Sequence, residues 1–311
     1  MTLAAAFFGT PEFAVPSLAA LLDAGIRVPL VVTQPDRPVG RHAELRPSAV
    51  AAFAAERGLA VEKPERIREN AALRERLRIA SVDAVAVVAY GRIFPADLLA
   101  LPRLGCVNVH ASLLPRHRGA SPVQAALLAG DRETGVATMR MEEQLDAGPI
   151  YLERRTPIGE RETAGELSAR LAAMGGALLA ETLTRLAAGG LAPWPQEGVP
   201  TFCRPIRRED GAVDWSRPAA ELERRLRAFT PWPGLFTFFE GDRVKIVAAR
   251  EGGGSAAAPG EVRLDGGELV ASAGGGSTLV LERLQRAGRR PVSGAEFARS
   301  AELPGRFRAA P

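Results

Sequence analysis

The sequence predicts an α/β protein in which a mostly parallel, helix-covered sheet comes first and a small β domain follows. Short apolar runs alternate with helical stretches as far as Gly190, a pattern typical of parallel sheets. Residues 191–200 are rich in Pro and Gly, and short glycine-punctuated β runs follow them. The 311 residues also fit two domains of roughly 100–200 residues each.

The first part of the chain alternates between the two kinds of element. Strands are expected at residues 3–8, 28–32, 83–89, 106–110, 136–141 and 150–154, and helices at 48–57, 66–77, 96–101, 122–128 and 163–188. A further helix follows the first strand, with Thr10 as its N-cap, Pro11 at its first position and Gly25 as its left-handed terminator. The order strand, helix, strand therefore begins at the N-terminus.

The second part of the chain has a different pattern of predicted elements. One helix is expected at 219–229, and short β runs are expected at 235–239, 244–248, 260–264, 269–271 and 278–284. Such runs predict a small barrel or sandwich. We therefore divide the chain into a first domain (1–189), a linker (190–204) and a C-terminal domain (205–311). The low-complexity stretch 252–258 is interpreted as a mobile hairpin loop.

The charge of the chain is small and unevenly distributed. There are 40 Lys and Arg residues against 36 Asp and Glu, a net charge of +4. Residues 1–204 hold 23 cations and 22 anions (+1), and residues 205–311 hold 17 and 14 (+3). A charge of this size does not by itself indicate a nucleic-acid partner. It does place most of the excess in the C-terminal domain.

The sequence carries no sign of secretion or of a membrane span. No apolar stretch approaches the roughly 18 residues of a spanning helix, and the N-terminus lacks the basic start of a signal peptide. Cys106 and Cys203 are too far apart to form a CxxC site, and two cysteines make no disulfide framework. We expect a cytoplasmic protein with two reduced thiols.

Cofactor motifs are absent from the turn after the first strand. Neither GxGxxG nor GxxxxGK[ST] follows Gly9, so no nucleotide cofactor is expected. His42, His110 and His117 are the three histidines, and without HExxH they do not assemble a three-ligand metal site. No metal is expected.

Asn108 and His110 are the strongest candidates for chemistry. Being two apart on a strand, they project to one face at its carboxyl end, where ligands bind in open α/β sheets. An amide can stabilise an oxyanion, and an Asp such as Asp146 can orient a histidine ring. The plainer alternative is a satisfied core histidine beside a turn-forming Asn. Because no GxSxG nucleophile is present, acyl transfer here would be direct.

Several motifs resemble the methionyl-tRNA formyltransferase branch of the 10-formyltetrahydrofolate-dependent formyltransferase family. They are FGTPEFA at 8–14, TQPDRP at 33–38, NVHASLLPR at 108–116, LDAG at 145–148 and PWPG at 231–234. The resemblance spans essentially the whole chain. It implies a Rossmann-like formyltransferase domain followed by an OB-fold-like domain that helps to hold tRNA, in a monomer with 10-formyltetrahydrofolate as cosubstrate and initiator methionyl-tRNA as partner.

The resemblance also assigns roles to residues of this chain. Asn108, His110 and Asp146 match the family's catalytic trio, and the loop of Ser112, Leu113, Leu114 and Pro115 matches its folate-binding loop. The implied reaction is attack of the methionyl α-amine on the formyl carbon. Asn108 and His110 would stabilise the oxyanion, and Asp146 would position His110 and assist proton removal.

The loop at 34–47 resembles the family's insertion that reaches the tRNA acceptor end. Where several relatives carry GRGKKL, this chain reads GRHAEL at 40–45. Arg41 is the first candidate for contacting the acceptor stem, followed by Arg37 and Arg46. Alternatively, Arg37 simply stabilises the turn between its flanking prolines. His117 stands where relatives often carry an aromatic residue and receives no catalytic role.

Three competing functions are weighed against this one. A sugar-nucleotide amine formyltransferase shares the core and a related C-terminal domain, but the QPDRPxGR loop and the basic β domain favour tRNA. A glycinamide ribonucleotide transformylase would resemble the first domain only. A noncatalytic RNA-binding barrel would leave the Asn108, His110 and Asp146 constellation unexplained, and it would need more exposed aromatic residues.

Overall fold

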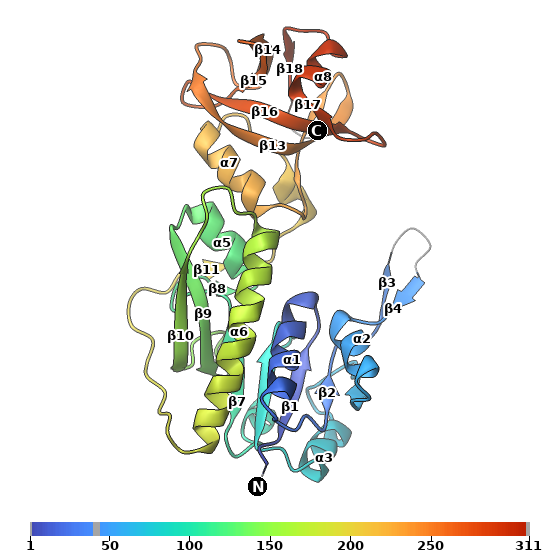
Figure 1. Cartoon of the computed structure of the whole chain (residues 1–311), viewed down its shortest axis with the longest axis vertical. Helices are drawn as coiled ribbons and strands as arrows, with labels where there is room; N and C mark the ends of the chain where they lie inside the picture. The colour runs from blue at the N-terminus through green and yellow to red at the C-terminus, as the bar shows by residue number, and fades with distance from the viewer. Residues whose placement is uncertain (1, 40–43, 309–311) are drawn as a thin grey trace. The chain divides into compact units, whose positions relative to one another are not determined.

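The computed structural model describes residues 2–39 and 44–308, and these form two compact units (Figure 1). The first unit comprises Met1–Pro122, Arg132–Ile158 and Ser168–Arg204, and the second comprises Val123–Asp131, Gly159–Leu167 and Pro205–Pro311. Among the described residues, no helix has the length and apolar character needed to cross a membrane.

The first unit is built on a seven-stranded sheet in the order β10-β9-β7-β6-β1-β2-β5. Neighbours from β5 to β7 pair in parallel, whereas β9 runs antiparallel to both β7 and β10. The strands are β1 (Ala5–Gly9), β2 (Val31–Val32), β5 (Val61–Glu62), β6 (Ala84–Val88), β7 (Cys106–His110), β9 (Glu133–Arg140) and β10 (Ile150–Pro157). The prediction of a mostly parallel, Rossmann-like sheet is confirmed.

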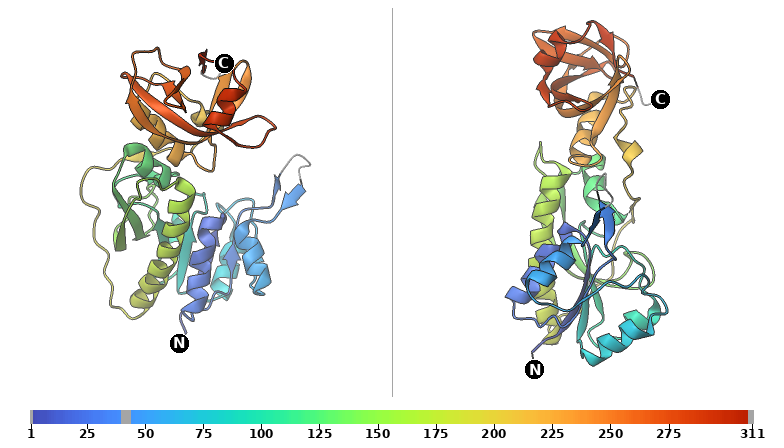
Figure 2. Two further views of the ribbon diagram at one scale, coloured as in Figure 1. Left: turned by 45° about the horizontal axis from the view of Figure 1, so that its top comes forward. Right: turned by 90° about the vertical axis from the view of Figure 1, so that its right-hand side faces the viewer.

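Helices cover both faces of this sheet (Figure 2). On one face, Leu18 and Leu183 pack with Phe7, and on the other Leu77 and Leu98 pack with Phe8. The first face carries α1 (Val15–Asp23), α2 (Ala49–Glu56) and α6 (Ala164–Ala187), and the second carries α3 (Ala71–Ile79) and α4 (Ala96–Leu99). Burial on both sides explains the nearly unbroken apolar runs of the central strands.

The first helix begins later than predicted. A 3-10 turn, η1 (Glu12–Ala14), precedes α1, and Pro16 stands in the first turn of that helix, where a missing N–H costs no hydrogen bond. Thr10 is not an N-cap, and its Oγ1 instead accepts a hydrogen bond from the Gln34 amide at 3.4 Å. Gly25 has φ +71°, which confirms its place as the left-handed residue after the helix.

Two small strand pairs complete the first unit. β3 (Arg37–Val39) and β4 (Glu44–Arg46) form an antiparallel hairpin. β8 (Arg118–Gly119) pairs in parallel with β11 (Phe202–Cys203), which lies in the stretch predicted to be a linker. The residues around β11 are therefore hydrogen-bonded to the first unit.

The second unit is an antiparallel barrel. Its strand order is β12-β13-β16-β15-β14-β18, and a bridge between Phe238 and Arg308 joins the two edges. The strands are β12 (Leu235–Phe239), β13 (Asp242–Gly254), β14 (Glu261–Asp265), β15 (Glu268–Ser272), β16 (Ser277–Arg286), β17 (Val292–Ser293) and β18 (Gly305–Arg306). With them lie η2 (Arg208–Gly211), α5 (Pro122–Ala129), α7 (Ala219–Ala228) and α8 (Gly294–Arg299). This confirms the OB-fold-like prediction.

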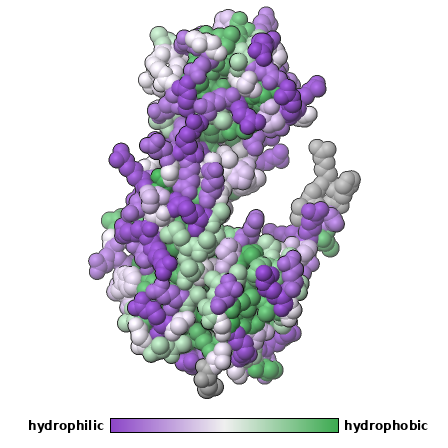
Figure 3. Space-filling view, in the orientation of Figure 1, coloured by the Kyte–Doolittle hydropathy of each residue, from purple (hydrophilic) through white to green (hydrophobic). Residues whose placement is uncertain are grey.

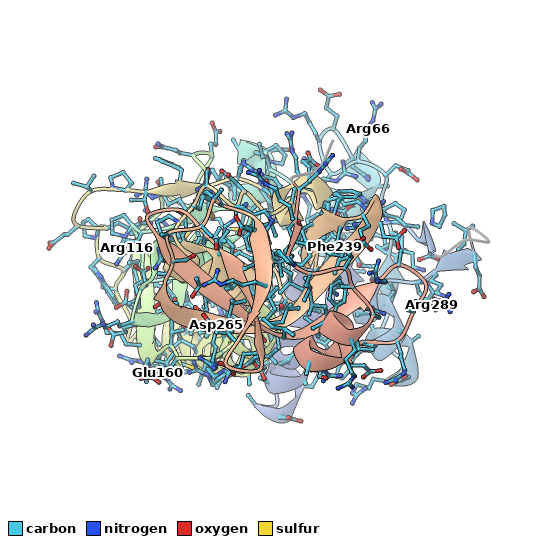
Figure 4. All side chains as sticks on the ribbon, turned by 90° about the horizontal axis from the view of Figure 1, so that it is seen from above. Arg66, Arg116, Glu160, Phe239, Asp265 and Arg289 are labelled. Atoms are coloured by element: carbon cyan, nitrogen blue, oxygen red, sulfur yellow. The ribbon has the colours of Figure 1, made fainter. Side chains whose placement is uncertain are left out.

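An aromatic cluster fills the barrel. Trp215 stacks on Phe307 with ring centroids 5.4 Å apart, and Phe239 packs edge-on against both Phe297 and Phe307. Phe239 is buried, whereas Asp265 and Arg289 are exposed (Figure 4). The aromatic residues of this unit therefore form its core.

The glycine run at 252–254 belongs to a strand, which corrects the prediction of a loop starting there. β13 continues to Gly254, which pairs with Ser277. A Cβ on Gly252 would lie 2.4 Å from Thr278 Oγ1, and that hydroxyl donates a hydrogen bond to the Gly253 carbonyl at 2.8 Å. Glycine is thus needed because the neighbouring strand approaches closely.

Ion pairs occupy several cations of the second unit, and Figure 3 shows hydrophilic residues among apolar ones on the visible face of this unit. Arg250 contacts Glu268 at 2.6 Å, Arg286 contacts Asp242 at 3.1 Å, and Arg290 contacts Glu296 at 2.7 Å, each pair within this unit. Because both partners of each pair lie in residues 205–311, these pairs leave the net excess of +3 in that range unchanged.

Phe7 tests the packing of the first unit. It is fully buried in β1, so Phe7→Ala should lower the free energy of unfolding of this unit by about 3–5 kcal/mol through lost burial and a cavity. Ile79 is 74% exposed, so Ile79→Ala should change it by about 0.5 kcal/mol or less. Urea denaturation measures both variants, and equal unfolding free energies would contradict this packing.

Candidate active site

β7 brings Asn108 and His110 to the same face of the sheet. Val107 and Val109 point to the core beneath α1 and α6, so the alternating side chains face the opposite side. Asn108 lies opposite Met139 of β9, and His110 ends the strand. The pair therefore stands where the sequence placed it, at the carboxyl end of a central parallel strand.

The ring of His110 is held by a main-chain carbonyl. The side chain is nearly buried, and its Nε2 lies 3.0 Å from the carbonyl oxygen of His117. A carbonyl oxygen can only accept, so Nε2 carries the hydrogen and donates it. Nδ1 faces Asp146, whose Oδ2 lies 3.7 Å away. That distance is too long for a hydrogen bond, so the carboxylate acts on the ring through its charge.

Asp146 reaches the histidine from the loop between β9 and β10. Its backbone is in the left-handed region, with φ +50°, which is uncommon for a residue with a side chain. Its Oδ2 accepts a hydrogen bond from the Gly119 amide at 2.8 Å. Backbone strain of this kind is typical of functional sites and needs support from its surroundings.

Gly148 ends the LDAG motif at a position where the structure leaves no room for a side chain. A Cβ at this position would lie 1.8 Å from the carbonyl oxygen of Arg140 on β9. The Arg140 amide in turn donates to the Pro149 carbonyl at 2.9 Å. The loop can therefore lie against β9 only when residue 148 has no side chain.

The carbonyl of His117 is fixed by the pairing of β8 with β11. His117 has φ +57°, and its amide donates to Thr201 Oγ1 at 2.8 Å. The amide of Arg118 donates to the Thr201 carbonyl at 2.9 Å. Residues more than 80 positions apart thus hold the acceptor of the His110 hydrogen bond.

Cys203 lies beside this turn as a thiol. Its Sγ donates to the carbonyls of His117 and Arg118 at 3.5 and 3.4 Å. Burial raises its pKa, and the negative charge of Asp146 raises it further, against the lowering effect of the Ser121 amide. Burial raises the pKa of Cys106 to about 12. Both cysteines are free, as predicted.

The predicted folate loop packs on β9 and β10. Leu114 forms a buried cluster with Ala137, Met139 and Ile150. The buried Ser112 hydroxyl donates to the Arg116 carbonyl at 2.6 Å. Ser112, Leu114 and Pro115 are buried and Leu113 is half-buried, so these residues shape the loop after β7.

Arg37 and Arg46, two of the three cations predicted to contact tRNA, lie on the β3–β4 hairpin. Arg37 donates to Gln34 Oε1 at 2.7 Å, and Gln34 in turn donates to the Tyr90 carbonyl at 2.7 Å. This agrees with the alternative that Arg37 stabilises its turn. Arg46 forms two hydrogen bonds to one oxygen of Glu44, at 3.2 and 2.9 Å, on the exposed hairpin. Arg41 lies outside the described residues.

Three residues that hold the His117 turn and the Asp146 loop in place were not predicted from the sequence. Gly119 acts through its main-chain amide, Thr201 through its side-chain hydroxyl and Gln196 through its side-chain amide. Thr201 and Gln196 lie in the stretch predicted as a linker. No spacing rule joins a residue near position 118 to one near 200, so local patterns carried no signal for them.

Both parts of the chain match models of known protein families. Residues 1–183 match the formyl transferase family and residues 205–302 match the formyl transferase C-terminal domain. The chain belongs to the formyl transferase family. Methionyl-tRNA formyltransferase of Methylibium petroleiphilum is 48% identical over 305 residues, covering 94% of this chain and 95% of that protein. The enzyme of the same name from Anaeromyxobacter dehalogenans is 47% identical over 298 residues, with the same coverage.

A solved structure shares the fold of this family member. The N-formyltransferase from Helicobacter canadensis, in complex with folinic acid and dTDP-3-aminofucose, superimposes with a TM-score of 0.67. It is 16% identical and covers 92% of this chain and all of that one. Within the described residues of the present formyl transferase, no group of three His, Cys, Asp or Glu side chains is placed to hold a metal ion.

Gly148 provides a test of the site's main-chain frame. Gly148→Ala should lower the turnover of formyl transfer by about 100-fold, because the added methyl group displaces the loop that carries Asp146. Gly253 has open space around its Cβ position, so Gly253→Ala should leave turnover within about two-fold. Initial-rate assays of both folded variants measure the effect, and wild-type turnover in Gly148→Ala would refute the argument.

Proposed function

We propose that this formyl transferase moves the formyl group of 10-formyltetrahydrofolate to the α-amine of methionine on initiator methionyl-tRNA, for translation initiation. The observation that carries the proposal is the juxtaposition of His110 and Asp146 beside Asn108 at the carboxyl end of β7. Relatives 47–48% identical over nearly the full chain are named methionyl-tRNA formyltransferase. The family and the folinic acid bound to the Helicobacter canadensis enzyme support a folate cosubstrate.

The chemistry is a direct displacement at the formyl carbon. The uncharged methionyl amine forms a bond to this carbon, and the carbonyl oxygen becomes an oxyanion. The bond from the carbon to N10 of the folate then breaks. The amine loses one proton and N10 gains one, so the products are the formylated amine and tetrahydrofolate. A tetrahedral intermediate of this kind needs donors to its oxyanion and an acceptor for the proton.

The described residues include candidate donors to the oxyanion and a candidate acceptor for the proton. Of these residues, none hydrogen-bonds to the half-buried side chain of Asn108, so its N–H groups can donate to the oxyanion. His110 donates Nε2–H to His117, which leaves Nδ1 to face the reacting groups and, when protonated, to donate as well. Asp146 stabilises the charged ring and accepts the amine proton.

The two substrates are assigned to different parts of the chain. Ser112, Leu113, Leu114 and Pro115 form the loop proposed to bind folate. Arg41, Arg37 and Arg46, which belong to the sequence segment 34–47, are proposed to contact the tRNA, with Glu44 opposing them. We assign catalysis to residues 1–189 and tRNA holding to residues 205–311, joined by residues 190–204.

An amino sugar is the competing acceptor, because the Helicobacter canadensis enzyme that shares this fold binds dTDP-3-aminofucose. At 16% identity that likeness concerns the fold alone. We favour methionyl-tRNA because full-length relatives three times as similar carry that name.

Acceptor assays with 10-formyltetrahydrofolate test the proposal. The protein should formylate initiator methionyl-tRNA in preference to elongator methionyl-tRNA, and a UDP-amino sugar should remain unchanged. His110→Ala and Asp146→Asn should each lower turnover by about 10²–10⁴-fold, because proton transfer and charge stabilisation are lost. Glu143→Gln, an exposed change in the same loop as Asp146, should have no effect.

Two results would contradict the proposal in different ways. Formylation confined to the amino sugar would remove methionyl-tRNA as the acceptor. Wild-type turnover in folded His110→Ala and Asp146→Asn variants would remove the catalytic assignment, whatever the acceptor.

A further inference from the structure

Gln196 makes more hydrogen bonds to the site than its place in a Pro/Gly-rich stretch suggests. Its Nε2 donates to the carbonyl of Asp146 at 2.9 Å and to the carbonyl of Gly148 at 2.7 Å. Its Oε1 accepts from Nε and Nη2 of Arg118 at 3.1 and 2.6 Å. Both donors and the acceptor of this half-buried amide are therefore used within the first unit.

The two carbonyls that Gln196 binds belong to the loop that carries the carboxylate. Asp146 holds a left-handed backbone conformation, φ +50°, which costs free energy unless neighbouring groups stabilise it. Binding the Asp146 and Gly148 carbonyls together fixes the orientation of the peptide groups between them. The direction of the Asp146 side chain follows from that backbone.

The other end of the amide holds the strand that orients the histidine. Arg118 lies between His117, whose carbonyl accepts from His110 Nε2, and Gly119, whose amide donates to Asp146 Oδ2. The Gln196 side chain thus links Arg118, the residue next to the carbonyl that accepts from His110, to the loop that carries Asp146. Gln196 itself hydrogen-bonds to neither the His110 ring nor the Asp146 carboxylate, within the described part of the chain.

We propose that Gln196 is a positioning residue for formyl transfer, which sets the place of the Asp146 carboxylate relative to the His110 ring. This inference rests on the catalytic roles proposed above for His110 and Asp146. It differs from a general structural role because it predicts a loss confined to the chemical step. Substrate binding, which depends on other loops and cations, should be preserved.

Two substitutions separate the hydrogen bonds of the amide. Gln196→Met keeps the length of the side chain and loses every hydrogen bond. Gln196→Glu keeps an acceptor for Arg118, but it loses both donors to the carbonyls of Asp146 and Gly148. Each should lower kcat by about 10- to 100-fold through misplacement of the carboxylate, with both KM values within two-fold of wild type. Glu197→Gln, an exposed neighbour, is the matched control and should match wild type.

The decisive comparison is a double-mutant cycle with Asp146→Asn. If Gln196 acts through Asp146, Gln196→Met should cost less than three-fold in kcat once Asp146 is already Asn. Hydrogen exchange adds a second readout, because the Gly119 amide should exchange faster in Gln196→Glu than in wild type. Should Gln196→Met fail to fold, Gln196→Glu retains the bond to Arg118 and takes its place in the cycle.

The outcomes distinguish this inference from the function on which it rests. A severe loss in Asp146→Asn together with wild-type kcat in both Gln196 variants would overturn the positioning role and leave the proposed function intact. An effect on KM alone, or fully additive losses in the cycle, would also overturn it. Wild-type kcat in Asp146→Asn would instead refute the catalytic role of Asp146, and the positioning role with it.

Discussion

The hydrogen bond from His110 Nε2 to the carbonyl of His117 governs the chemistry of the site. Because a carbonyl only accepts, this 3.0 Å contact places one proton on Nε2 and leaves Nδ1 toward Asp146. A histidine that could change its tautomer freely would present a donor at one moment and an acceptor at the next. The surrounding main chain removes that freedom.

The position of that carbonyl depends on contacts far apart in the sequence. His117 adopts a left-handed conformation, and the pairing of β8 with β11 holds it there through Thr201. The Asp146 loop is fixed in a similar way, by Gly148 against β9 and by the amide of Gln196. The side chains proposed to act in catalysis are few, and the groups that hold them in place are mostly main-chain carbonyls and amides. Residues 190–204, which were predicted to be a linker, therefore contribute hydrogen bonds to the site.

Much of the fold followed from local patterns. Apolar strands buried on both faces alternate with helices, and this alternation predicted the sheet of the first unit. Short glycine-punctuated β runs predicted a small barrel or sandwich for the second. The predictions were wrong where a residue type is common in two kinds of local structure. Thr10 resembles an N-cap but accepts from Gln34, and Gly252 resembles a loop residue but lets β13 approach Thr278. Both outcomes are decided by tertiary neighbours.

The candidate trio could be predicted in part for the same reason. Asn108 and His110 share one face because of strand geometry alone, and Asp146 was the next acidic residue able to reach them. Gln196 and Thr201 were not found, because hydrogen bonds to main-chain carbonyls and amides leave no residue-type pattern at the other end. Glu44 was identified as a departure from the family loop, and the structure pairs it with Arg46.

Nitrogen-15 NMR of the His110 ring shows which ring nitrogen carries the proton. With histidine-labelled protein at a pH where the ring is neutral, we expect a protonated, pyrrole-type Nε2 and an unprotonated, pyridine-type Nδ1. Thr201→Val, which removes the acceptor for the His117 amide, should weaken that preference. A neutral ring protonated on Nδ1 in the wild-type protein would rule out the hydrogen bond to His117, because Nε2 could not then donate.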